Sequence, residues 1–125
     1  MNQDESRYPA DWLRIAELDL VRVSRNLRDE DPIAAGFFLQ QALEKFIKGF
    51  LLKHGWNLRR IHDLEDLLEE AFTYDGTLAQ FMPLCRRVTS YYVLDRYRFL
   101  SDSGPSQEEV EEQVAEAKRL IERLR

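Results

Sequence analysis

The sequence is poor in the residues that covalent cross-links and metal sites require. Its 125 residues include one cysteine, Cys85, and two histidines, His54 and His62. A single cysteine excludes an internal disulfide and any multi-cysteine zinc site, which fits a reducing compartment. Long apolar runs are also absent, because no stretch approaches the roughly 18 apolar residues of a membrane span, and residues 1–5 are polar and acidic. We therefore expect a soluble, cytoplasmic protein without a membrane partner.

Motifs that bind the common cofactors are missing as well. The chain contains no glycine-rich phosphate loop of the Walker or dinucleotide type and no pair of histidines at metal-binding spacing. Cys85 falls on an apolar helical stripe without an arranged histidine and acid, which disfavours a nucleophilic role. We expect neither a cofactor nor a metal ion, and kinase, dehydrogenase and metalloenzyme activities are set aside.

Charge is distributed unevenly along the chain. The formal net charge of -5 argues against a protein that binds nucleic acid with its whole surface, because lysine and arginine supply most of the affinity for phosphate. Residues 45–60, however, contain lysine and arginine but no acid, and residues 62–75 contain acids but no lysine or arginine. Two interpretations stay open: solvated helix faces of opposite charge, or a local anion-binding patch.

The pattern of apolar residues predicts an all-α protein. Apolar side chains recur every three or four residues in five segments, and none alternates as a β-strand does. The segments run from about residue 10 to 29, from Asp31 to Gly55, from Asp63 to Asp75, from about 77 to 97, and from Ser106 onward. Capping residues mark three of the starts: Asp31 before Pro32, Asp63, and the capping box of Ser106 and Glu109. Residues 1–125 suffice for one domain with its own core.

The second segment is predicted to lie at the centre of the fold. Its apolar residues spread too widely around the helix to be covered from one side only. Gly36 and Gly49 lie inside it, although glycine costs about 1 kcal/mol relative to alanine in a helix interior. We therefore expect neighbouring helices to approach closely at both glycines.

Four polar residues of the second segment share one helix face, because they are three or four residues apart. They are Gln41, Glu44, Lys45 and Lys48. One interpretation is a solvated face on which Glu44 and Lys48 form a surface pair. The other is a cleft lined by Gln41 and Lys45. In that cleft Arg96 holds a phosphate, and Tyr92 or Tyr97 stacks on a base.

Asp19 also bears on whether this polar face is solvated or buried in a cleft. It borders the apolar stripe of the first helix, where an unpaired acid is costly. We expect a buried pairing of Asp19 with Lys45 or Arg96.

The order and spacing of these clusters resemble the minimal HEPN family, a nucleotide-binding domain named for its occurrence in higher eukaryotes and prokaryotes. The matching parts are Trp12 with residues 16–20, residues 38–48, residues 62–68, Tyr91–Tyr92 and Arg96–Tyr97. The resemblance implies an up-and-down bundle of four to five antiparallel helices that is usually dimeric. It also implies a partner, a minimal nucleotidyltransferase, in a module of toxin–antitoxin type.

Many HEPN proteins are metal-independent ribonucleases with a signature arginine and histidine that have four to six residues between them. Arg96 is the candidate arginine here, but residues 101–103 are Ser, Asp and Ser, and neither His54 nor His62 follows an arginine at that spacing. Histidine suits the proton transfers of RNA cleavage, whereas Arg96 supplies only charge. We therefore expect a protein that binds nucleotide or RNA and is not an enzyme.

The residues expected at the binding site are Gln41, Lys45, Lys48, His62, Tyr92, Arg96 and Tyr97, with Asp19 and Glu44 in structural polar roles. Two alternatives remain open. One is a ribonuclease that uses Arg96 with a displaced His62. The other is a structural helical adaptor that binds no nucleotide or RNA.

Apolar residues outside the predicted inner faces indicate a contact surface. They are Phe37, Phe38, Phe50 and Leu52 in the second segment, and Tyr91, Leu94 and Phe99 at the end of the fourth. A monomer of this size seldom exposes so much apolar area, so we expect a homodimer, with coverage by residues 1–9 as the alternative. A two-fold arrangement would bring two copies of Arg96 and Tyr97 toward one groove and link dimerisation to ligand binding.

Overall fold

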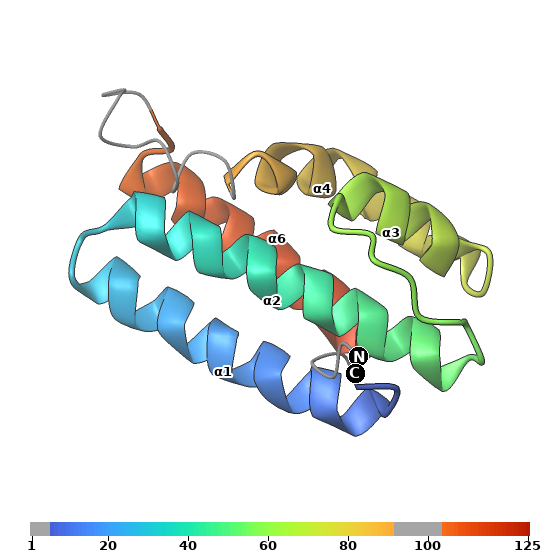
Figure 1. Cartoon of the computed structure of the whole chain (residues 1–125). Coiled ribbons are helices and arrows are strands. Elements are labelled where there is room, and N and C mark those ends of the chain that lie inside the picture. The colour runs from blue at the N-terminus through green and yellow to red at the C-terminus, as the bar shows by residue number, and fades with distance from the viewer. Residues whose placement is uncertain (1–5, 92–103) are drawn as a thin grey trace.

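The computed structural model describes residues 6–91 and 104–125. In these two ranges the chain forms α-helices and one 3₁₀ helix, with no β-strand. They are α1 (Pro9–Arg28), α2 (Pro32–Lys53), α3 (Leu64–Phe72), the 3₁₀ helix η1 (Gly76–Phe81), α4 (Met82–Thr89) and α6 (Gln107–Leu124). The long helices α1, α2 and α6 lie side by side, and α3 and α4 pack on the side of α2 away from α1 (Figure 1). The predicted all-α helical bundle is confirmed.

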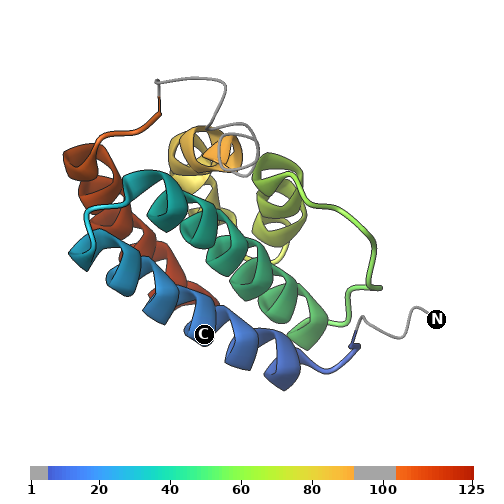
Figure 2. The same ribbon diagram turned by 60° about the vertical axis from the view of Figure 1, so that its left-hand side comes forward.

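The central position of α2 agrees with its broad apolar surface. This helix contacts α1, α3, α4 and α6, and more than half of its 22 residues are buried. Figure 2 shows α2 enclosed between α1, α6 and the α3–α4 pair. Because α2 has neighbours on several sides, some of its polar residues are covered by other parts of the chain.

Side-chain caps fix the starts of α2, α3 and α6, as the sequence predicts. Asp31 accepts a hydrogen bond from a backbone N–H of the first turn of α2, and Asp63 accepts two in the first turn of α3. Ser106 and Glu109 form the reciprocal capping box of α6. Each cap pairs a donor that the helix itself leaves unsatisfied, a contribution of about 1 kcal/mol.

The prediction of one continuous helix over residues 77–97 is wrong at its start. Residues 76–81 form η1, and the α-helix begins only at Met82. Pro83 explains the break, because proline lacks an N–H and its ring clashes with the carbonyl four residues earlier in an α-helix. The chain therefore turns as a 3₁₀ helix and restarts as α4 with Pro83 in its first turn. Residues 92–97 of the predicted helix lie outside the described residues.

Both interior glycines of α2 lie where another side chain comes very close, as predicted. A Cβ at Gly49 would lie 2.9 Å from the methyl end of Leu13 in α1. A Cβ at Gly36 would lie 2.9 Å from the ring of Tyr91, whose hydroxyl donates a 2.6 Å hydrogen bond to Gln113 in α6. The Leu13 side chain is flexible, whereas the Tyr91 ring is fixed by its backbone at one end and by its hydrogen bond to Gln113 at the other.

This difference predicts opposite outcomes for the same substitution. Replacing glycine by alanine in a helix gains about 1 kcal/mol, and overpacking costs about 1–3 kcal/mol. Gly49→Ala should be nearly neutral because Leu13 can move, while Gly36→Ala should lower the free energy of unfolding by about 1–2 kcal/mol. Urea denaturation of the two variants measures the difference. Equal stabilities would show that the Tyr91 ring is not fixed.

Two residues of the predicted apolar contact surface are buried within the described chain. Phe50 and Tyr91 are each 6% exposed, so that part of the prediction is wrong. Phe50 belongs to the core side of α2, and Tyr91 packs over Gly36. Leu94 and Phe99 lie outside the described residues. The large apolar side chains most exposed on α1 are Ile15, Leu18 and Val21. None of the described helices is both long and apolar enough to span a membrane.

Candidate functional site

Several charged and polar side chains of α2 are buried in the bundle. The buried polar residues of the helix are Gln40, Glu44 and Lys48, and Asp19 of α1 is buried beside them. The predicted Glu44–Lys48 pair exists, with 3.0 Å between Nζ and Oε2, but the interpretation as a solvated surface pair is wrong. Their burial follows from the central place of α2, whose polar face is covered by α1 and by the loop that precedes α3.

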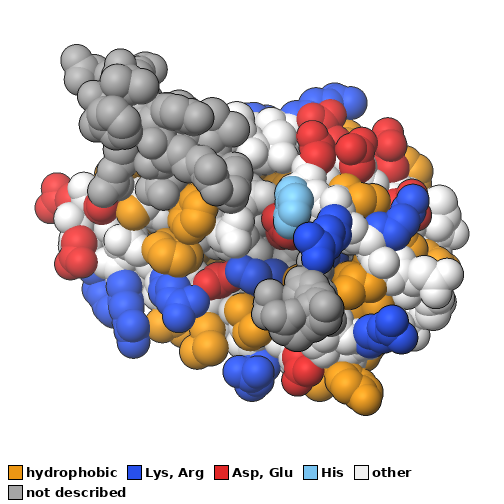
Figure 3. Space-filling view, viewed as in Figure 1, with side chains coloured by type: hydrophobic (Ala, Val, Ile, Leu, Met, Phe, Trp, Pro, Cys, Tyr) orange, Lys and Arg blue, Asp and Glu red, His pale blue; other side chains and the backbone are white. Residues whose placement is uncertain are grey.

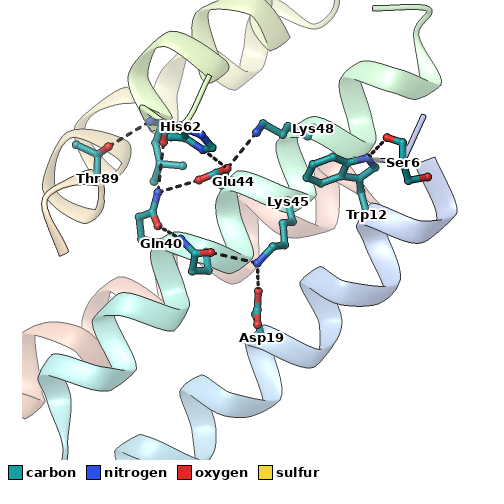
Figure 4. Close-up of polar contacts among 11 residues, drawn as sticks. Ser6, Trp12, Asp19, Gln40, Glu44, Lys45, Lys48, His62 and Thr89 are labelled. Carbon is teal, nitrogen blue, oxygen red and sulfur yellow. Dashed lines mark hydrogen bonds and ion pairs between the residues drawn. The ribbon is translucent and has the colours of Figure 1, made fainter. Parts of the chain in front are cut away.

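Glu44 is the acceptor at the centre of this cluster. Its Oε2 accepts hydrogen bonds from Lys48 Nζ at 3.0 Å and from His62 Nδ1 at 2.9 Å, and its Oε1 accepts one from Gln40 Nε2 at 3.3 Å (Figure 4). Burying a carboxylate is costly unless its charge and lone pairs are satisfied. Here a buried cation balances the charge, and the other donors fill the remaining positions.

His62 connects the buried cluster to the surface. Its side chain is 71% exposed, while its Nδ1 contacts the buried Glu44 carboxylate. An ionised carboxylate only accepts hydrogen bonds, so Nδ1 carries the proton and a neutral ring keeps Nε2 as its acceptor. Gln40 Nε2 also donates to the backbone oxygen of His62 at 3.3 Å, and Thr89 Oγ1 accepts from Leu64 N at 3.2 Å. These bonds hold both the imidazole and the start of α3.

Asp19 forms a second cluster on the α1 side of α2. Its Oδ2 accepts from Lys45 Nζ at 2.5 Å and its Oδ1 from Arg22 at 2.6 Å, so the predicted pairing with Lys45 is confirmed. Lys45 also donates to Gln41 Oε1 at 3.2 Å, and Gln41 Nε2 donates to Gln40 Oε1 at 2.7 Å. Gln40 thereby joins the two clusters.

The result is a continuous chain of polar contacts, which we call the polar network. It comprises Asp19, Gln40, Gln41, Glu44, Lys45, Lys48 and His62. It runs from α1 across α2 to the loop before α3, and every member except Gln40 is a predicted site residue. Gln40 lies one turn before Glu44 and within residues 38–48, which resemble the HEPN family, and these were the signals that could have identified it. Tyr92, Arg96 and Tyr97 lie outside the described residues.

A hollow of about 200 Å³ lies beside Lys45, lined also by Ser6, Asp11, Trp12 and Ile15. The ring of Trp12 lies 5.2 Å from Lys48 Nζ, and its Nε1 donates to the backbone oxygen of Ser6 at 2.6 Å. Lys48 is therefore enclosed by Trp12 and Glu44, and its side chain is only 1% exposed. In this arrangement Lys48 fixes Glu44, whereas Lys45 and His62 reach the surface.

Cys85 has no chemistry to contribute in this state. It is buried in the core, and burial raises the pKa of its thiol to about 12. A protonated thiol is a weak nucleophile. Within the described residues, no three side chains of His, Cys, Asp or Glu converge as metal ligands would.

Comparison with known proteins places the chain in a family. The model of the HEPN domain matches residues 9–125. A search of curated proteins gave no match. Among solved structures, the crystal structure of TT1696 from Thermus thermophilus is similar, with a TM-score of 0.80 and 26% sequence identity, covering 93% of this chain and 94% of that one. The match to the domain spans nearly the whole sequence, and the chain belongs to the HEPN domain family.

Proposed function

We propose that residues 1–125 form one domain that binds a nucleotide or RNA at the outer end of the polar network. Family membership supports a role related to nucleotides or RNA in general. The observation that carries the proposal is the exposed imidazole of His62 held by the buried carboxylate of Glu44. A buried ion pair is weak evidence for stability, since apolar residues often serve as well. We propose that the buried ion pairs of the polar network serve to orient His62 and Lys45 at the surface.

The surface groups of the network suit a phosphorylated ligand. Lys45 supplies an ammonium, Gln41 an amide, and His62 a ring nitrogen that accepts when neutral and donates when charged. Arg96 with Tyr92 or Tyr97 completes the proposed site by binding phosphate and stacking on a base. Lys48 contributes indirectly, through Glu44.

Binding of a mononucleotide and of single-stranded RNA tests this function. We expect His62→Ala to weaken both about tenfold, a loss of about 1.4 kcal/mol, because the ligand loses one oriented polar contact. Lys118→Ala, which removes an exposed cation of α6, is the control and should bind as the wild type does. Titration at low salt gives the affinities. If the folded wild-type protein binds neither ligand at any salt concentration, the adaptor alternative replaces this proposal.

A ribonuclease is the second candidate, and the Glu44–His62 contact is the observation in its favour. A carboxylate on one imidazole nitrogen fixes the tautomer and leaves the other nitrogen as a general base, as in catalytic triads. In this mechanism Nε2 of His62 takes the proton of the 2′-hydroxyl while the 2′-oxygen bonds to phosphorus. The bond from phosphorus to the 5′-oxygen breaks, the leaving 5′-oxygen takes a proton from water, and Arg96 stabilises the negative charge on the phosphate oxygens. RNA cleavage in the presence of a chelator that disappears in both His62→Ala and Arg96→Ala would replace the binding-only proposal.

We further propose that the protein is a homodimer and the partner of a minimal nucleotidyltransferase in a toxin–antitoxin module. HEPN domains often dimerise. Ile15, Leu18 and Val21 follow one another at three-residue steps on α1 and add exposed apolar area to the partly buried Phe37 and Phe38. Light scattering at micromolar concentration measures the mass. A value that stays near 14.9 kDa as concentration rises excludes the dimer.

A further inference from the structure

Two hollows border the loop between α2 and α3, apart from the hollow at Lys45. Both hollows are lined by Gly55, Trp56 and Asn57. The first, of about 340 Å³, is also lined by Arg7, and the second, of about 320 Å³, by Arg59 and Tyr74. Both volumes fall at the lower end of the range for small-molecule sites. Each hollow thus combines a guanidinium with the edge of a loop.

Tyr74 is an exposed ring with a fixed orientation. Its side chain is 44% exposed, and its ring lies 5.0 Å from that of His54 at 35° between planes. The His54 ring in turn lies 4.4 Å from the ring of the buried Phe50, and its Nδ1 contacts Phe50 O at 2.9 Å. The stack is anchored in the core, so Tyr74 offers a preorganised surface on which a planar group can stack.

Arg59 lines the same hollow as Tyr74, and only part of its guanidinium is engaged in contacts. Its guanidinium lies 5.6 Å from the centre of the Trp56 ring, and one nitrogen, Nη2, contacts Glu70 Oε1 at 2.8 Å. Trp56 Nε1 donates to the same oxygen at 3.1 Å. A guanidinium has five N–H donors in a planar fork, and the Arg59 side chain is half exposed. The remaining donors can therefore meet a phosphate.

The balance of charge around the loop favours an anion. Within the described residues, Arg7 and Lys53 form no ion pair, and both are exposed. Of the nearby acids, Glu70 is paired with Arg59 and accepts from Trp56. Asp75 accepts hydrogen bonds from the hydroxyl and N–H of Thr77, which lower the pKa of its carboxyl, so it keeps its negative charge. The cations Arg7, Lys53 and Arg59 still outnumber these two carboxylates. Figure 3 shows basic side chains near the histidine that is visible in this view and a group of acidic side chains above it.

We propose that Arg7, Lys53, Arg59 and Tyr74 form an accessory surface that binds single-stranded RNA, with a base on the Tyr74 ring and phosphates on the cations. Stacking accepts any base and contributes about 1–3 kcal/mol per base. The inference rests on the proposed function, since His62 follows Arg59 by three residues, at most about 11 Å along the chain. We expect a strand bound at His62 to extend onto this surface, and a mononucleotide bound there to leave the Tyr74 ring unoccupied.

The test compares UMP with an oligouridine of about 12 nucleotides, a typical site size for single-strand binders. Tyr74→Ala should weaken oligouridine binding about 5- to 100-fold and leave UMP affinity unchanged, and Tyr74→Phe should restore oligouridine affinity because the ring remains. Arg59→Gln should weaken oligouridine and reduce the salt slope by about one. Lys118→Ala serves as the cation control, and circular dichroism confirms that each variant is folded.

The outcomes separate this surface from the site at His62. If UMP and oligouridine bind but Tyr74→Ala and Arg59→Gln leave both affinities unchanged, the accessory surface is overturned and the proposed function stands. If the wild type binds neither, both proposals fall. Duplex RNA that binds as tightly as oligouridine overturns the stacking role of Tyr74, because paired bases cannot be splayed onto a ring.

Discussion

Glu44→Ala is expected to lower the free energy of unfolding by about 3–5 kcal/mol, the typical cost of breaking a buried ion pair by removing one partner. The variant leaves Lys48, whose side chain is 1% exposed, as a cation without its anion. It also removes the acceptor of His62 Nδ1 and one of the two acceptors of Gln40 Nε2. Urea denaturation monitored by circular dichroism measures the loss.

Two further variants identify burial as the cause. Glu17→Ala removes an equally well-formed contact, 2.8 Å to Arg125, but both side chains are about half exposed, so it should cost less than about 1 kcal/mol. Adding Lys48→Met to Glu44→Ala removes the stranded cation and should recover part of the stability, which a double-mutant cycle quantifies. A Glu44→Ala protein within about 1 kcal/mol of the wild type contradicts the arrangement described for the network.

The fold was largely predictable because its signals are local. Asp31, Asp63 and Ser106 mark helix starts through hydrogen bonds that reach two or three residues along the chain, and Gly36 and Gly49 mark close contacts. Proline at position 83 was also a local signal for the break between η1 and α4. The apolar periodicity, however, continues across Pro83 and predicted one continuous helix. Whether Phe50 is buried depends on which helices surround α2, and the broad apolar surface of this helix does not reveal this.

The site was predictable only in part, because its decisive contacts join distant residues. Helical spacing shows that Glu44 and Lys48 can pair, but it treats charged residues as outward-facing. Their burial depends on His62, 18 residues after Glu44, and on Trp12 of α1. Asp19 was recognised because it borders the apolar stripe of the first helix, so its need for a cation was visible in the sequence.

The second large loss of stability is expected at the ion pair of Asp19 and Lys45. As at Glu44, the costlier substitution is the one that leaves a buried charge without its partner. Lys45→Met leaves Asp19, 3% exposed, with Arg22 as its remaining donor, and should cost about 3 kcal/mol. Asp19→Ala leaves two cations that reach solvent, Lys45 at 20% and Arg22 at 45% exposure, and Lys45 keeps Gln41. Alanine also favours the helix more than aspartate does, so this loss should be only about 1 kcal/mol.

The order of the two losses, measured by urea denaturation, is the test. If only the number of deleted ion pairs mattered, Asp19→Ala would cost at least as much as Lys45→Met, because it deletes the 2.5 Å interaction with Lys45 and also the one with Arg22. Arg22→Ala is the matched control: it removes the other cation on the same carboxylate, and its exposure limits the loss to less than about 1 kcal/mol. A greater loss for Asp19→Ala than for Lys45→Met would mean that Asp19 stabilises the docking of α1 on α2 through more than the charge that it shares with Lys45.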